Sequence, residues 1–273
     1  MIIQSHKLVA EAGDTPVKWL NSPNQSGVIQ PKYLIIHYTA GRNAKSSIDW
    51  FMNPQANASA HLVIAQDGTI TQMVPFNKKS FHAGISHWAG LEGMNSHSIG
   101  IELDNPGKLK QVGHKWMAWF GTEYPASKLL VAPHKHQTVP SGWHVYTQAQ
   151  IESCIKASLA IFHHYRLKDI LGHDDISPGR KEDPGPAFPM ESFKSRVMGR
   201  LEDHAPLYKV VKEGARFRAA PSLDAAIMGK LKLNTKVEFI RSHMDWFLVK
   251  LIGKVPGIIE PEGWVHSSLL TRL

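Results

Sequence analysis

The chain has 273 residues, of which 42% are hydrophobic and 20% charged, a balance that supports a packed core and favours about two globular domains. Lys and Arg (31) outnumber Asp and Glu (23), and the net charge of +8 favours a polyanionic partner without distinguishing nucleic acid, membrane and cell wall. The single cysteine, Cys154, excludes an internal disulfide, and we expect it to be a core residue.

The distribution of residues narrows the classes of partner. Basic residues are scattered, with no basic run or aromatic–basic motif, so we do not expect a nucleic-acid partner. No stretch of about 18 apolar residues occurs, so we expect no membrane span. The N-terminal residues show neither the apolar run nor the cleavage site of a signal peptide, and none is expected.

A buried strand and a short helix are predicted early in the chain. Residues 32–38 form a continuous apolar run, which is typical of a strand buried on both faces, and it ends near His37. Residues 46–52 show the pattern of a short helix, which stops before Pro54 because a residue preceding proline disfavours the helical conformation.

A hairpin and a second buried strand follow. Residues 61–74 consist of two β-rich runs joined by Asp67-Gly68, the pair that a two-residue primed turn prefers. Residues 98–103 predict a strand, in which successive side chains point to opposite faces. Glu102 therefore faces away from the three apolar residues of that strand, Ile99, Ile101 and Leu103.

The remaining sequence predicts an insertion, two helices and a separate β-rich region. Residues 105–146 are rich in Gly, Pro, His and Trp, and we interpret them as a long irregular insertion that could wall a groove. Thr147 is suited to be the N-cap of a helix that extends to about Tyr165, and a last helix is predicted over residues 190–201.

The region after residue 206 contains only short strand-like runs separated by Gly, Pro and Asn, which is typical of a small β-barrel. The predicted fold is therefore α/β, with a mixed central sheet flanked by helices over residues 1–203, followed by a small all-β barrel over residues 207–273.

Residues suited to metal chemistry gather in the segment 172–187, which carries His173, Lys181 and Asp183 within eleven residues. If this part of the segment is extended, Lys181 and Asp183 face the same side while Glu182 faces away. A zinc site needs two or three nitrogen or oxygen ligands and one open position.

His37 and Glu102 would complete such a set, but each residue has a structural alternative. A histidine after an apolar strand is often a hydrogen-bonded structural residue, and a glutamate in such a strand can be a buried ion-pair partner. The loop Lys181 and Asp183 can be an ordinary surface pair. Taken singly, these residues do not decide between the two readings.

Five segments in order resemble the type-2 N-acetylmuramoyl-L-alanine amidases, whose fold is shared with phage lysozyme-type amidases and peptidoglycan recognition proteins. The resemblance covers roughly residues 30–190, and its last segment is highly specific because it fixes a His, a Lys and an Asp at once. The segments are YLIIHYTAG (33–41), SAHLVIAQDGTI (59–70), FHAG (81–84), NSHSIGIEL (95–103) and GHDDISPGRKEDPGPAF (172–188).

The resemblance implies a zinc-dependent enzyme that hydrolyses the amide bond between N-acetylmuramic acid and L-alanine in peptidoglycan or muropeptides. It places one zinc ion per chain on His37, His173 and Asp183, and it makes Glu102 and Lys181 the catalytic residues. The alternative is a non-catalytic peptidoglycan recognition protein. Such proteins have typically lost zinc ligands, and none is missing here.

Two further histidines match family positions near the substrate groove. A structural hydrogen-bonding role is the favoured reading for His61, whereas His82 is equally compatible with substrate contact and with a scaffold role. In phage lysozyme-type relatives a tyrosine precedes the first of these histidines. Ala60 stands there in this chain, which favours the branch that uses a catalytic glutamate.

Residues 207–273 resemble a bacterial SH3-like domain, a family that commonly binds cell-wall peptide or glycan, so the resemblance implies targeting to the wall. The alternative is a module that only packs against the catalytic domain. Without a signal peptide, we expect synthesis in the cytoplasm and action on the wall after signal-independent release or export, as for an endolysin or an injected effector. A cytoplasmic recycling role is the alternative, and the sequence does not predict the oligomeric state.

Overall fold

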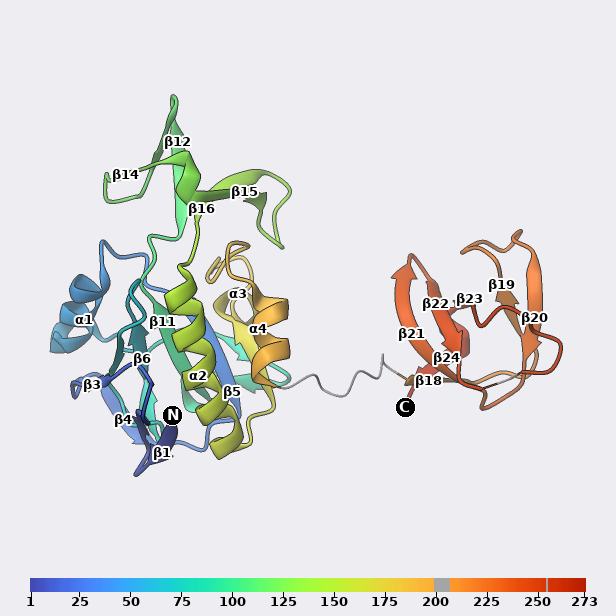
Figure 1. Cartoon of the computed structure of the whole chain (residues 1–273), viewed down its shortest axis with the longest axis horizontal. Helices are drawn as coiled ribbons and strands as arrows, with labels where there is room; N and C mark the ends of the chain where they lie inside the picture. The colour runs from blue at the N-terminus through green and yellow to red at the C-terminus, as the bar shows by residue number, and fades with distance from the viewer. Residues whose placement is uncertain (199–206, 254) are drawn as a thin grey trace. The chain divides into compact units, whose positions relative to one another are not determined.

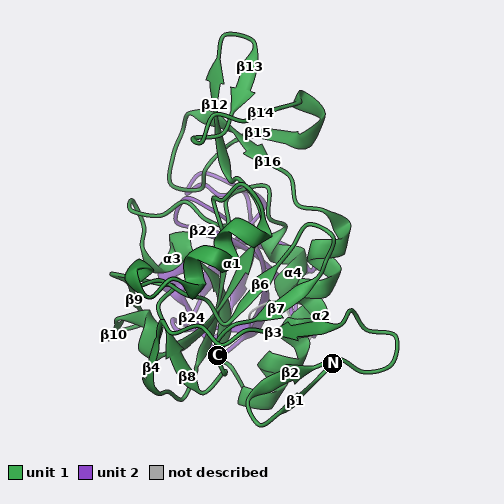
Figure 2. Ribbon diagram, turned by 90° about the vertical axis from the view of Figure 1, so that its left-hand side faces the viewer, with its two compact units in different colours: residues 1–199 green, residues 200–273 purple. Residues whose placement is uncertain are grey.

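The structure is a computed structural model that describes residues 1–198, 207–253 and 255–273. The chain forms two compact units, residues 1–199 and 200–273, which are coloured separately in Figure 2. Each unit has its own apolar core, so the two are described one at a time.

Unit 1 is built on a six-stranded mixed sheet of order β17-β5-β11-β6-β7-β3 (Figure 1). The first four strands in this order run parallel, β7 is antiparallel to β6, and β3 is parallel to β7. The strands predicted at residues 32–38 and 98–103 are confirmed as β5 and β11. The bounds are β3 (Val17–Trp19), β5 (Tyr33–Tyr38), β6 (Leu62–Ile64), β7 (Ile70–Gln72), β11 (Ser98–Leu103) and β17 (Asp169–Gly172).

Four helices are described in unit 1. The helix predicted from Thr147 to about Tyr165 is confirmed, and the helix predicted over residues 190–201 is confirmed as far as Val197. Thr147 caps the longest helix, where its hydroxyl accepts the N–H of Gln150 in a capping box. Residues 46–52 lie in a helix that begins two residues earlier, because Asn43 is its cap. The last helix ends at Val197, and its predicted continuation from residue 199 lies outside the described residues. The bounds are α1 (Ala44–Met52), α2 (Gln148–Tyr165), α3 (His173–Ile176) and α4 (Met190–Val197).

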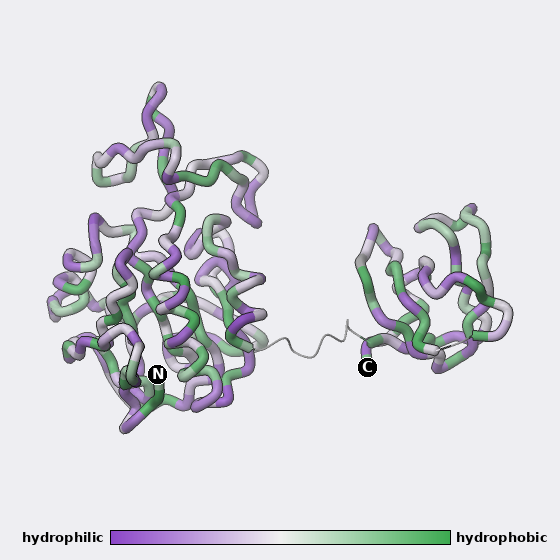
Figure 3. Tube along the Cα trace, viewed as in Figure 1, coloured by the Kyte–Doolittle hydropathy of each residue, from purple (hydrophilic) through white to green (hydrophobic). Residues whose placement is uncertain are grey.

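The main core lies between the central sheet and α2, and Figure 3 shows the hydrophobic colour concentrated along these central strands. Leu34 and Ile36 of β5 pack in this core, as do the three apolar residues predicted to share one face of β11. Cys154 of α2 is fully buried there, as expected. Because side chains alternate along a strand, His37 and Glu102 must face the opposite side of the sheet.

The predicted hairpin at residues 61–74 forms, but the prediction of a two-residue turn was wrong. β6 and β7 are joined by residues 65–69, and the N–H groups of Ala65 and Gly68 bond to the carbonyls of Thr69 and Ala65. Gly68 has a φ of 87°, which is the left-handed conformation that follows a type I turn in a three-residue loop. The Asp67 carboxylate accepts the N–H of Thr69, which stabilises the wider turn.

The insertion at residues 105–146 is ordered, so the prediction of an irregular segment was wrong. It forms a five-stranded antiparallel sheet of order β14-β13-β12-β16-β15, which projects at the top of unit 1 in Figure 1. Its strands are too short and too exposed to show clear alternation in the sequence. The bounds are β12 (Lys108–Val112), β13 (Lys115–Met117), β14 (Glu123–Tyr124), β15 (Leu129–Pro133) and β16 (Pro140–His144).

Three small two-stranded sheets and three short 3-10 helices complete the described part of unit 1. The sequence did not predict them, because two to four residues carry no readable periodicity. The pairs are β1 (Ile2–Gln4) with β2 (Lys7–Val9), β4 (Gln25–Val28) with β8 (Lys78–Ser80), and β9 (His87–Trp88) with β10 (Leu91–Glu92); the 3-10 helices are Pro54–Ala56, Met94–Ser96 and Ala126–Lys128.

The described residues of unit 2 are all-β, as predicted, and their seven strands form one antiparallel sheet of order β20-β19-β23-β22-β21-β18-β24 around a small apolar core. A 3-10 helix, Ser267–Leu269, precedes the last strand. No helix among the described residues of either unit is long and apolar enough to cross a membrane. The bounds are β18 (Leu207–Val210), β19 (Ala215–Arg218), β20 (Ile227–Leu231), β21 (Lys236–His243), β22 (Trp246–Leu251), β23 (Glu262–His266) and β24 (Leu270–Arg272).

Candidate metal centre and active site

The candidate site lies where three neighbouring parallel strands end. His37 and Glu102 are the next-to-last residues of β5 and β11, and the register of the sheet places them side by side. His173 follows β17 directly, and its neighbour Gly172 is paired with Ile36. Sites in open sheets commonly form at the carboxyl ends of parallel strands, and here the adjacent strands bring three polar side chains to one edge.

The loop after α3 adds a carboxylate to the two histidines. The Nδ1 atom of His37 is 2.9 Å from the Nδ1 of His173 and 2.9 Å from Oδ2 of Asp183. The Nδ1 of His173 is 3.0 Å from the same oxygen, and all three residues are buried. These residues could therefore hold one metal ion. A tetrahedral zinc site with bonds of about 2.0–2.2 Å spaces its donors about 3.3–3.6 Å apart, so the set is compact enough to share an ion.

The partners of His37 leave its Nδ1 without a proton. The Ser98 hydroxyl donates to the carbonyl of Met94, so its oxygen accepts from Nε2–H of His82. The Nδ1 of His82, 2.9 Å from Nε2 of His37, must then accept the proton of His37. The lone pair of Nδ1 in His37 is thus directed at His173 and Asp183, as a metal ligand requires.

His173 is oriented in the same way by a backbone carbonyl. Its Nε2 lies 3.0 Å from the carbonyl oxygen of Ala83, which can only accept a hydrogen bond, and 3.3 Å from an N–H group of Arg180, which can only donate one. The shorter contact, with the carbonyl, favours a proton on Nε2, which leaves the Nδ1 lone pair on the side of Asp183. Burial also lowers the pKa of His37 to about 4, with a further contribution from the neighbouring His173, so His37 is neutral at pH 7.

Glu102 lies beside this group and is itself buried. Its Oε2 has no hydrogen-bond partner within the described residues, which is uncommon for a buried carboxylate oxygen. Burial is the main cause that raises the pKa of Glu102 to about 8, the negative charge of Asp183 contributes in the same direction, and the positive charge of Lys181 opposes both. A group that exchanges its proton near neutral pH is suited to general acid–base catalysis.

Lys181 and Glu182 face in the directions expected of an extended segment. Lys181 is half-buried, and its charge influences both His37 and Glu102. Glu182 points instead to the insertion, where it accepts hydrogen bonds from Lys108 (2.7 Å) and Gln137 (2.5 Å). The structure therefore brings together all five residues selected for the site from the sequence.

The two remaining candidate histidines differ in their surroundings. His61 is fully buried, its Nδ1 accepts the N–H of Gly100, and its Nε2 donates to the carbonyl of Lys78. These contacts support a structural role. His82 packs so closely on Gly100 that an added Cβ would lie 2.4 Å from its ring, and its contact with His37 gives it a positioning role.

Two site residues were missed in the sequence reasoning. The Asn95 side chain accepts the N–H groups of His82 (3.0 Å) and Ala83 (2.7 Å), and the Arg180 guanidinium donates to the Ala83 carbonyl (2.8 Å). Asn95 and Arg180 thus fix the position of His82 and Ala83, which in turn contact His37 and His173. Asn95 and Arg180 lie within the segments that carry the family resemblance, which was the available signal.

The ends of the parallel strands carry a buried His–His–Asp group that could hold a metal ion, and a buried carboxylate with an unpaired oxygen. On a mixed α/β sheet, this arrangement is suited to the class of metal-dependent hydrolases. The particular family follows from comparison. The chain matches the family described as N-acetylmuramoyl-L-alanine amidase over residues 27–186, and a bacterial SH3 domain over residues 213–271. Because the first match covers more than half of the 273 residues, the chain belongs to the N-acetylmuramoyl-L-alanine amidase family, as the sequence resemblance indicated.

Curated relatives include two amidases of Escherichia coli. The chain is 34% identical over 180 residues to N-acetylmuramoyl-L-alanine amidase AmiD, covering 63% of this chain and 55% of that protein. It is 36% identical over 141 residues to 1,6-anhydro-N-acetylmuramyl-L-alanine amidase AmpD, covering 51% of this chain and 58% of that protein. The chain thus spans a little over half the length of the curated relatives it matches.

Solved structures of similar proteins include a complex of E. coli AmiD with anhydro-N-acetylmuramic acid-L-Ala-D-gamma-Glu-L-Lys. It matches with a TM-score of 0.48 and 29% identity, covering 63% of this chain and 59% of that chain. A selenomethionine derivative of AmpD matches with a TM-score of 0.49 and 25% identity, covering 72% of this chain and 99% of that chain.

Proposed function

We propose that the chain is a zinc-dependent amidase that hydrolyses the bond between N-acetylmuramic acid and L-alanine of peptidoglycan. The observation that carries the proposal is the convergence of two histidine Nδ1 atoms and one carboxylate oxygen within 2.9–3.0 Å of one another. Two imidazole nitrogens and one carboxylate gathered this closely form a set of ligands suited to a divalent cation such as zinc. The substrate follows from the family and from the names of AmiD and AmpD.

Zinc held by His37, His173 and Asp183 would supply a Lewis acid that polarises the scissile carbonyl and lowers the pKa of water toward about 7. Glu102 takes the proton of the attacking water and later delivers it to the departing amine of L-alanine. Lys181 donates to the oxygen that becomes negatively charged, a kind of contact worth about 2.7–4 kcal/mol in other enzymes. His82 holds the ring of His37 in place through the bond between their nitrogens.

We further propose that the two units have different functions. Unit 1 is the catalytic domain, with the insertion beside its site, and unit 2 binds the cell wall. A wall-binding module adds little to an enzyme that acts on soluble recycling fragments, whereas it raises the effective concentration of an enzyme at an insoluble polymer. Intact peptidoglycan is therefore the substrate that suits this combination of domains.

Digestion of purified sacculi with the full chain tests the proposal. We expect free L-alanine amino termini and glycan with unsubstituted muramic acid, both identified by mass spectrometry. A chelator should abolish their release, and added zinc should restore it. Sacculi that bind the protein but remain intact in the presence of zinc would indicate a recognition protein without catalysis.

A further inference from the structure

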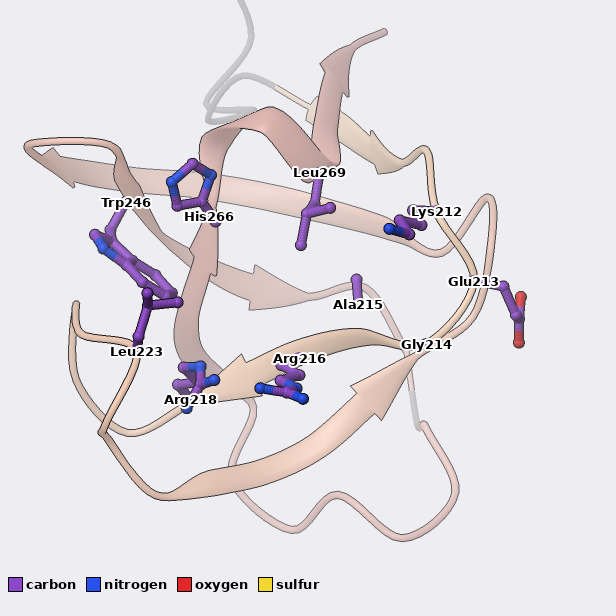
Figure 4. A pocket seen from close by; sticks show the side chains of 10 residues that line it. All are labelled: Lys212, Glu213, Gly214, Ala215, Arg216, Arg218, Leu223, Trp246, His266 and Leu269. Carbon is purple, nitrogen blue, oxygen red and sulfur yellow. The ribbon is translucent and has the colours of Figure 1, made fainter.

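Unit 2 contains a pocket of about 210 Å³ (Figure 4). It lies between the turn after β18, one face of β19, and the adjoining ends of β22 and β23. Arg216 and Arg218 of β19 line the pocket together with Ala215, which also contacts the core of unit 2.

The wall of the pocket is strongly cationic. Arg216, Arg218 and Lys212 all line it, and within the described residues no carboxylate forms an ion pair with any of the three. Arg218 is only 3% exposed and uses one N–H in a 2.6 Å bond to the carbonyl of Ala225. A guanidinium has five N–H donors, so most of its donor capacity is available to a ligand.

The acidic residue of the lining does not neutralise these charges. Glu213 points away from the pocket in Figure 4, and its carboxylate accepts the N–H of Leu233 at 2.7 Å. The pocket therefore presents two arginines and a lysine with their counter-charge missing. Such an arrangement is suited to an anion, because arginine binds carboxylates and phosphates through two parallel hydrogen bonds.

The opposite side of the pocket is apolar, with one directed donor. The Trp246 ring is buried, and it lies 6.0 Å from the guanidinium carbon of Arg218 and 5.3 Å from the His266 ring. Leu223 and Leu269 extend this surface. The Nδ1 of His266 accepts the N–H of Ser268, so its remaining nitrogen, Nε2, carries the proton of the neutral ring.

We propose that this pocket binds the stem peptide of peptidoglycan through a free carboxylate, with a small apolar side chain packed on Trp246. This deepens the proposed wall-binding role of unit 2 and rests on it. In peptidoglycan, the stem peptide carries the carboxylates and the small apolar side chains. The glycan of uncleaved peptidoglycan presents hydroxyl and amide groups, which do not need three cations, because the carboxyl group of its muramic acid forms the amide bond to L-alanine.

Isothermal titration calorimetry with the zinc-loaded full chain tests the pocket. The probes are the tripeptide L-Ala-γ-D-Glu-L-Lys, the same peptide with its carboxylates amidated, and inorganic phosphate. The pocket variant is Lys212→Gln/Arg216→Gln, which changes two exposed residues. The control is Lys232→Gln/Lys250→Gln, which removes the same charge from exposed positions of unit 2 outside the pocket.

We expect the pocket variant to bind the tripeptide at least tenfold more weakly than the control, which should match the unaltered chain. Amidation should weaken binding to the unaltered chain by a similar factor. Peptide binding that is equal in the two variants, or insensitive to amidation, would overturn the proposal. Phosphate that displaces the tripeptide from the unaltered chain at equal concentration would show a general anion site and also overturn it.

Two further measurements separate this proposal from that of the amidase activity. Thermal unfolding checks that both variants fold as the unaltered chain does. Cleavage of a soluble muropeptide should be the same in all three proteins, since the altered residues belong to unit 2. If the protein shows no amidase activity but its tripeptide binding still depends on the pocket, the proposed enzymatic function is wrong and the proposed role of the pocket is retained.

Discussion

At the scale of single residues, the candidate site depends on which ring nitrogen of His37 and of His173 carries the proton. His82, Ser98 and the carbonyl of Ala83 determine the proton positions of both metal-site histidines, and each histidine consequently turns a lone pair toward Asp183. Burial keeps His37 neutral at pH 7, so it needs no deprotonation before it can bind metal. The three residues of the candidate metal site are thus already gathered in a ligand-like arrangement.

Substitution Asp183→Ala should lower the bound zinc well below the stoichiometric amount, because it removes one of three ligands and the only anionic one. Metal content after dialysis, measured by atomic emission, checks this. Asp49→Ala is the matched control, since Asp49 is exposed on α1 and pairs only with Lys45. Full metal content in the Asp183 variant would contradict the ligand assignment.

Substitution Glu102→Gln should leave zinc bound but reduce turnover roughly 100- to 10,000-fold, the usual effect of losing a general base. The amide is nearly isosteric with the carboxylate, so the buried position remains filled. Turnover of a soluble muropeptide and metal content are measured on the same sample. Near-normal turnover would show that another group moves the proton.

Local periodicity explains which site residues could be predicted. Alternation along β11 fixed the direction of Glu102, and the end of an apolar run located His37, because both signals lie within a few residues. The link from His37 to His82 joins residues 45 apart in the chain, and no local pattern carries such a contact. The sequence therefore indicated that His82 lies near the site but did not distinguish substrate contact from a scaffold role.

At the scale of elements, the insertion is the part of unit 1 that the sequence predicted least well. Several contacts join the insertion to the region of the site. Among them, Lys108 donates to Glu182, His134 pairs with Asp174 at 2.9 Å, and the indole N–H of Trp119 donates to the carbonyl of Ala40 at 2.7 Å. Trp119 is nevertheless 78% exposed and lines a pocket of about 470 Å³ together with Trp116. Exposed aromatic surface of this kind is suited to binding a partner, and we propose that it contacts polymeric peptidoglycan.

Substitution Trp119→Ala should therefore weaken the use of polymeric peptidoglycan more than that of a small muropeptide. Loss of one aromatic contact is worth about 0.5–1.5 kcal/mol, so KM for sacculi should rise roughly two- to tenfold. Trp50→Ala on α1, an exposed tryptophan of unit 1 outside this pocket, is the control. Equal KM values for the two variants would show that the insertion does not contact the polymer.

At the scale of the whole molecule, the chain combines two independent cores. The boundary was predicted from a change in pattern, since helical periodicity gives way to short strand-like runs near residue 206. The order of strands in either sheet could not be predicted in the same way, because pairing joins distant segments. β17, for example, pairs with β5 across more than 130 residues.

Truncation to residues 1–203 should preserve cleavage of small muropeptides, because the candidate site lies wholly within unit 1. The truncated protein should sediment less with whole sacculi, since the tether that raises its effective concentration is gone. Cosedimentation and muropeptide turnover are compared with those of the full chain. Equal sedimentation of the two proteins would contradict a targeting role for unit 2.

The pairing of Glu102 with His37 across β11 and β5 has a consequence for how the protein can fail. A slip of β11 by one residue would turn Glu102 into the apolar layer under α2 and move Ile101 or Leu103 to the site, because strand faces alternate. A misaligned β11 would thus destabilise the apolar core and also remove Glu102 from the candidate site. The register that buries the apolar face of β11 is therefore the same register that places Glu102 beside His37 in the candidate site.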